Sequence, residues 1–177
     1  MKKLLLASLC MASVALTACD KKPNEAATTG TANQPVATQA AVTLSKDVAA
    51  DIKSDLTQIQ TLSTNKAKEA LAFQNEVTQA AQKNDKAALQ GIVEKMKSYT
   101  EGFNKELDAL TLKSSEVDAV RSKMKEANNL GVELSEAGLK NPPDMNEINT
   151  LQKKATEMQQ ALLTEMQNLQ TKANTAK

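Results

Sequence analysis

Residues 44–62, LSKDVAADIKSDLTQIQTL, carry the pattern that decides the fold. Large apolar residues recur there at steps of three and four, which places them on one face of an α-helix. The pattern continues less regularly further on, so we expect one amphipathic helix from residue 44 to about residue 82. Residues 61–65 are poor in helix formers and predict a kink. The apolar positions are Leu44, Val48, Ile52, Leu56, Ile59, Leu62, Leu71, Phe73 and Val77.

Three further apolar stripes follow with the same helical spacing, separated by turn and capping residues. The separating signals are Asn84 as an N-cap, Ser115 with Asp118 as a weak capping box, Gly138 as a helix end, Pro142-Pro143 as a break and Asp144 with Glu147 as a restart. The stripes are Leu89, Val93, Met96, Tyr99, Phe103, Leu107 and Leu110; then Val117, Val120, Met124, Ala127, Leu130 and Leu134; then Ile148, Leu151, Ala155, Met158, Leu162, Met166 and Leu169. We expect their Met and aromatic residues to fill the core.

The stripes predict an all-α fold, because no stretch of the chain has the alternation of a β-strand. Short links favour antiparallel neighbours, and narrow, heptad-like stripes are typical of left-handed bundles. We therefore predict an up-down-up-down four-helix bundle over residues 44–177, with a frayed C-terminus. A first helix of the predicted length would measure about 58 Å against about 39 Å for the second, so it must bend or project. An elongated coiled coil that associates between chains is the alternative.

The N-terminus has the three regions of a secretory signal peptide, here residues 1–18. Lys2 and Lys3 precede an apolar run that is too short to span a membrane, which takes about 20 residues. The run ends in Leu16, Thr17, Ala18 and Cys19. This ending resembles the lipobox of bacterial lipoproteins.

The resemblance implies that Cys19 receives a diacylglycerol on its sulfur, becomes the first residue after cleavage by signal peptidase II, and is acylated on its new amino group. Three acyl chains hold a protein to a bilayer far more firmly than one. The implied partners are the bilayer and the machinery that processes and sorts lipoproteins. In the enteric version of the family, an Asp at the place of Asp20 favours the inner membrane. Lys21 beside it blunts that charge, so we expect the outer membrane, facing the periplasm, with the inner membrane as the alternative.

Residues 19–43 predict a disordered tether between the lipid and the helices. They are rich in Thr, Ala, Asn, Gln and Pro, and such a segment buries too little apolar surface to offset its ordering entropy. A flexible chain of about 24 residues has a mean reach of roughly 27 Å. The tether would hold the helical body clear of the headgroups.

Composition removes most ordinary chemistry. The chain has no His, and its two Cys are Cys10 in the leader and Cys19, which the resemblance implies is lipidated. Neither a Ser-His-Asp nor a Cys-His arrangement can be built, nor a zinc site of the Cys/His kind. With 22 basic and 21 acidic residues, two Phe, one Tyr and no Trp, the chain also lacks the features of nucleic-acid binding. We therefore expect no enzymatic activity, no metal site and no cofactor apart from the covalent lipid.

The last residue is Lys177, whose side-chain amine is a candidate attachment point for peptidoglycan. A lipidated cysteine, apolar heptads and a final lysine are similar to the Braun lipoproteins. There an L,D-transpeptidase joins the terminal lysine to the cell wall. This chain is several times longer and folds back on itself. The leader and the helical, histidine-free body are also similar to abundant lipoproteins linked to resistance against signal peptidase II inhibitors.

Three functions remain open on the sequence alone. The first is a structural envelope lipoprotein that links membrane to peptidoglycan and influences sensitivity to signal peptidase inhibitors. The second is a periplasmic accessory protein whose helical face holds a partner protein. The third is a carrier of apolar ligands that uses a Met-lined interior.

Overall fold

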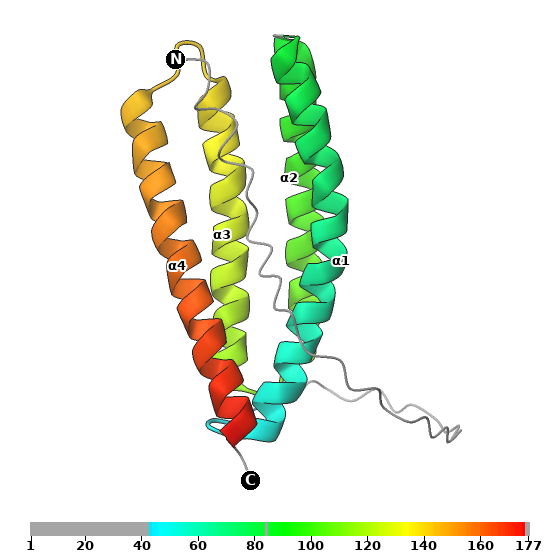
Figure 1. Cartoon of the computed structure of the whole chain (residues 1–177), viewed down its shortest axis with the longest axis vertical. Helices are drawn as coiled ribbons and strands as arrows, with labels where there is room; N and C mark the ends of the chain where they lie inside the picture. Colours follow the sequence, from blue (N-terminus) through cyan, green and yellow to red (C-terminus); the bar gives the residue numbers. More distant parts are fainter. Residues whose placement is uncertain (1–42, 84, 176–177) are drawn as a thin grey trace, which may run out of the picture.

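The computed structural model describes residues 43–83 and 85–175, which form four long helices. They are α1 (Ala49–Gln82), α2 (Lys86–Ala109), α3 (Ser115–Leu139) and α4 (Met145–Thr175). Successive helices run in opposite directions, and α4 packs against α1 as well as against α3 (Figure 1). The predicted up-down-up-down bundle is therefore confirmed, and its helices find their partners within one chain.

The first helix begins at Ala49, five residues later than the apolar pattern predicts. Asp47 has a φ of 59°, in the left-handed region, so a right-handed helix cannot include it. Residues 43–48 instead lie against the loop between α2 and α3, where Ser45 and Ser114 form an isolated parallel β-bridge. From Ala49 on, α1 is continuous through residues 61–65, where the composition predicts a kink. The Thr61 hydroxyl bonds back to the carbonyl of Thr57 within the helix, 2.8 Å away.

Two of the predicted capping residues are wrong by one position. Asp85, not Asn84, is the N-cap of α2, and its carboxylate accepts a hydrogen bond from the Ala88 amide at 2.9 Å; Asn84 lies outside the described residues. The N-cap of α3 is Ser114, and its side chain does not cap its own helix.

The other end of the bundle follows the predicted signals more closely. The Asp144 carboxylate accepts hydrogen bonds from the amides of Asn146 and Glu147 at 2.9 and 3.2 Å, which confirms the predicted restart. Helix α3 ends at Leu139, one residue beyond the predicted glycine end.

The main apolar core lies in the half of the bundle where α1 begins and α4 ends. All four helices and the α2–α3 loop contribute to it, so the four predicted stripes do meet in space. Two predicted core positions are wrong: Val48 is 42% exposed and Leu71 is 60% exposed. The buried members are Ile52, Leu56, Ile59, Phe103, Leu107, Leu112, Val117, Val120, Leu162, Met166 and Leu169.

The opposite half of the bundle is packed differently. A second, smaller apolar cluster there is built from α1 and α2 alone, around Ala80, Ile92 and Met96. An ion pair between Lys97 and Glu136, at 3.4 Å, joins α2 to α3 in this half. In Figure 1 the α1–α2 hairpin and the α3–α4 hairpin diverge towards the top of the view. Within the described residues, no helix combines the length and the hydropathy that a membrane span requires.

Candidate functional site

The most highly connected polar region lies at one end of the bundle, which we call the base. Here α1 begins, the loop joins α2 to α3, and α4 ends (Figure 1). The first described residue, Thr43, and the last, Thr175, both belong to this end. An even number of antiparallel helices returns the chain to the end at which it entered. The base is therefore where the described body connects to both flanking segments.

A buried carboxylate organises the base from within. Asp55 of α1 is 0% exposed. Its Oδ2 accepts hydrogen bonds from the amides of Lys113 and Ser114 at 2.8 and 2.7 Å, and from the Ser114 hydroxyl at 2.8 Å. Ser114 precedes the first turn of α3, so Asp55 satisfies backbone donors there from another helix. Gln58, one turn further along α1, bonds weakly to Oδ1 at 3.4 Å.

The entering chain is fixed to the same loop from outside. The Ser45 amide donates to the Lys113 carbonyl at 2.7 Å, and the Ser115 amide donates to the Ser45 carbonyl at 2.9 Å. The Ser45 hydroxyl adds a bond to Lys113 O at 3.1 Å. Residues 43–48, which we call the entering segment, are thus held beside the start of α3.

Three charged side chains connect the entering segment to α3 and to the last turns of α4. Lys172 pairs with Asp47 and lies 3.7 Å from a carboxylate oxygen of Glu116. Glu116 also accepts a hydrogen bond from the Asp47 amide at 2.8 Å. We call Asp47, Glu116 and Lys172 the base latch, because they join the two places where the chain enters and leaves the bundle.

The charges of the base latch support one another. The hydrogen bond and attraction of Lys172 lower the pKa of Asp47, and the hydrogen bond of Asp47 raises the pKa of Lys172. For Glu116, burial alone would raise the pKa. Hydrogen bonds from the Asp47 amide, from its own amide and from the Ser115 hydroxyl outweigh that and lower it. Each of the three groups is therefore held in its charged form.

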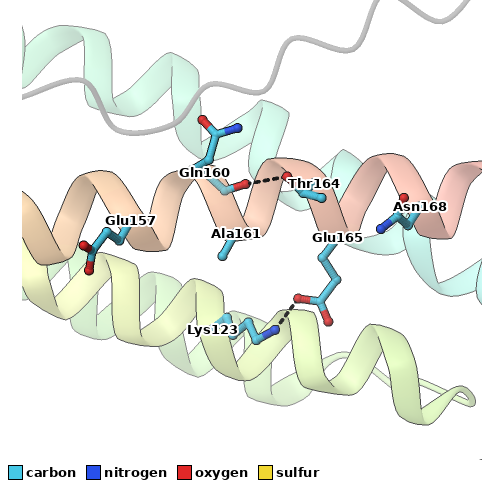
Figure 2. A pocket seen from close by; sticks show the side chains of 7 residues that line it. All are labelled: Lys123, Glu157, Gln160, Ala161, Thr164, Glu165 and Asn168. Carbon is cyan, nitrogen blue, oxygen red and sulfur yellow. Dashed lines mark hydrogen bonds and ion pairs between the residues drawn. The ribbon is translucent and has the colours of Figure 1, made fainter.

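The grooves described on the helical surface are open to solvent. One groove lies along α4 beside α3, and an ion pair between Lys123 and Glu165 crosses it (Figure 2). Around it are short polar side chains of α4, including Thr164 and Asn168. Open grooves of this kind lack the enclosed apolar walls of small-molecule sites. Within residues 43–83 and 85–175, no group of three or more acidic, His or Cys residues is placed to hold a metal ion.

The interior residues with candidate binding roles serve as core. Met96 and Met166 are buried, while Met124 and Met158 pack against the main core. Phe103 belongs to that core as well. Tyr99 lies edge-on to Phe73, and its hydroxyl donates to the Lys66 carbonyl at 2.6 Å. These contacts match the expectation of core packing.

The site residues expected from the sequence all lie outside the described residues. They are Leu16, Thr17, Ala18, Cys19, Asp20, Lys21 and Lys177. The sequence reasoning missed the residues that organise the base, Asp55 and the base latch. One signal was available for Asp55: an acidic residue three places after Ile52 and four before Ile59 falls on the apolar face of α1.

Comparison with known proteins gives one positive result. Neither the curated proteins nor the solved structures contain a match to this chain. A family model described as "Uncharacterised lipoprotein PM1805" matches residues 53–174, which is most of the chain and nearly the whole helical body. This match supports the identification as a lipoprotein and a lipid-anchored place in the cell envelope. The chain therefore belongs to the uncharacterised lipoprotein PM1805 family.

Proposed function

We propose that this lipoprotein is a non-enzymatic structural component of the envelope, anchored by acyl chains on Cys19 and joined to peptidoglycan through Lys177. Membership of a lipoprotein family supports the lipid anchor. The similarity to the Braun lipoproteins supports the wall attachment. The observation that carries the combination is the convergence of both ends of the helical body at the base.

The convergence matters because it sets the path between the two attachments. The chain that comes from Cys19 enters at the base, and the chain that leads to Lys177 leaves from it. The length of the helices therefore adds nothing to the distance that the link can span. The 24 residues after Cys19 span at most about 80–85 Å when extended, and this segment sets the reach of the link. The helical bundle therefore lies to one side of the path from the lipid to the wall and does not form part of it.

The same link would explain an effect on signal peptidase II inhibitors. An unprocessed lipoprotein keeps its apolar leader and stays in the inner membrane. With Lys177 fixed to peptidoglycan, such a molecule would join the inner membrane wrongly to the wall. Loss of the protein would then make cells less sensitive to the inhibitor. The resemblance to LirL, an abundant Acinetobacter lipoprotein linked to such resistance, supports this part of the proposal. We place the processed protein in the outer membrane, because Lys21 offsets the charge of Asp20 that would favour the inner membrane.

Membrane fractionation with and without lysozyme, combined with muropeptide mass spectrometry, tests the proposal. The native protein should yield a C-terminal peptide of this chain on a peptidoglycan stem peptide. Lys177→Arg should abolish that adduct, whereas Lys153→Arg, at an exposed lysine of α4, should leave it intact. An unchanged wall-bound fraction in Lys177→Arg cells would refute the covalent link. Full membrane partition of a Cys19→Ser protein would refute the lipid anchor.

The second function, that of holding a partner protein, is tested at the exposed apolar residues of the body. Leu71 exposes a large apolar side chain on α1, in the half of the bundle away from the base. A partner at this surface should be lost when Leu71 is changed to Glu and retained in Val48→Glu, which changes an exposed apolar residue at the base. Site-specific crosslinking in cells would show one dominant partner, lost in the first variant alone. Equal crosslinking in both variants would exclude this surface.

A further inference from the structure

The entering segment, residues 43–48, is held at the base by polar contacts more than by the apolar core. Val48 is 42% exposed, and Ser45, Asp47 and Glu116 make the hydrogen bonds that fix the segment. The first fully buried apolar residue of α1 is Ile52. Removing the polar contacts would therefore free the entering segment without opening the main core.

The end of α4 is held in a similar way. Leu169 is its last buried apolar residue, and beyond it Ala173 only packs against the edge of the core. Lys172 lies in the same last turns, and its ammonium pairs with Asp47 of the entering segment. Exposed ion pairs contribute little to stability one by one. A contact of this kind can open while the helices beneath it stay packed.

We propose that the base latch is a releasable clasp between the entering and leaving segments of the chain, which opens before the helical core does. Its use in the cell rests on the proposed function, because only a molecule attached at both ends is pulled there. Its mechanics rest on the structure alone. Asp47 and Lys172 belong to segments that leave the same end of the bundle, so tension between those segments pulls directly on their ion pair.

Opening the clasp and fraying the adjoining ends of α1 and α4 would lengthen the link while the main core stays packed. Residues 43–51 precede the first buried apolar residue of α1, and residues 170–175 follow the last buried one of α4. Freed and extended, these segments have a total length of up to about 50 Å, of which the residues already in helix spanned about 1.5 Å each before release. A link with this reserve follows small changes in the distance between membrane and wall while the main core stays intact.

Hydrogen exchange of the mature, non-lipidated polypeptide tests whether the clasp is a local element. In Lys172→Gln, peptides from residues 43–48 and 170–175 should exchange about three- to tenfold faster than in the parent. Peptides from the buried parts of α1 and α4 should be unchanged. Lys172→Arg should restore the parent rates, because it keeps the charge. Lys153→Gln, which breaks an exposed pair with Glu157 on the same helix, should have no effect at the base.

Two outcomes would overturn the proposal. Unchanged exchange at the base in Lys172→Gln would show that the ion pairs do not hold the segments. Faster exchange throughout the bundle would show that they belong to the global fold. A pulling measurement with handles at the two ends of the mature chain gives a second criterion: the parent should lengthen in a small step before the main unfolding event, and Lys172→Gln should lack that step. These measurements use the purified chain, so they test the clasp independently of the wall linkage. Muropeptide analysis tests the wall linkage.

Discussion

Replacing Asp55 should destabilise the bundle more than any other single polar change at the base. In Asp55→Ala, the amide and hydroxyl of Ser114 lose their acceptor inside the protein, at a residue that is 0% exposed. A buried donor left unpaired costs about 1–3 kcal/mol. The amide of Lys113 loses the same acceptor but belongs to an exposed residue and can bind water instead. We therefore expect a loss of about 3–4 kcal/mol in the free energy of unfolding.

Asp55→Asn separates geometry from charge. The amide oxygen of Asn can occupy the place of Oδ2 and keep the same three donors. What is lost is the charge-assisted part of each bond, partly offset because a neutral group costs less to bury. We expect about 1–2 kcal/mol, clearly less than for Ala.

Urea unfolding of the mature polypeptide, followed by circular dichroism at 222 nm, measures both variants against the parent. Ser114→Ala provides the matched control, because it removes the hydroxyl donor together with its need for an acceptor and should cost about 1 kcal/mol. A loss below 1 kcal/mol in Asp55→Ala would refute the reasoning. An Asn variant as unstable as the Ala variant would show that the charge itself, and not the set of paired donors, holds the loop.

Three further predictions concern the core and the base latch. Leu107→Ala, at a residue that is 0% exposed, should cost about 3–4 kcal/mol in urea unfolding. Burial raises the pKa of Tyr99 to about 12, so its absorbance at 295 nm should titrate near pH 12; because that pKa is raised, its stabilising contribution is present below pH 10 and is lost as the pH rises towards 12. The two carboxylates of the base latch have lowered pKa values, so they stabilise it above their unfolded values of 3.8 and 4.5 and cease to do so as the pH falls further. With Lys46 and Lys172 as the cations beside them, the amide NMR signal of Asp47 should shift below about pH 4 and stay constant between pH 5 and 9; a constant signal down to pH 2 would contradict this.

The sequence predicted the helices well because their pattern is local. Ile52, Leu56 and Ile59 follow one another at steps of one turn, so their common face is visible without any knowledge of the fold. The predicted helix boundaries were less accurate where the conformation of a single residue decides where a helix begins. Asp47 prevents α1 from beginning earlier, because its backbone is in the left-handed region, and apolar spacing does not report backbone conformation. Leu71 lies two residues before Phe73 and departs from the helical spacing of the stripe, which is why its side chain is exposed.

The base could not be predicted because its contacts join distant parts of the chain. The partners of Asp55 lie 58 and 59 residues further on, and Lys172 lies 125 residues from Asp47. Periodicity reports which residues share one face of one helix and says nothing about which loop that face meets. An acidic residue within an apolar stripe is a usable warning of such a contact, because a buried carboxylate requires donors. Surface lysines such as Lys172 carry no comparable signal among the 22 basic residues of the chain.

The arrangement of the bundle also bears on how the two proposed functions relate. The lipid and the wall would both act through the base, where the chain enters and leaves. A partner protein would use the opposite half, where Leu71 is exposed and the small second cluster involves α1 and α2 alone. Because the two surfaces are at different ends of rigid helices, neither function obstructs the other. Wall linkage should therefore survive Leu71→Glu, and partner crosslinking should survive Lys177→Arg; a single variant that abolished both would show that the two ends are coupled through the bundle.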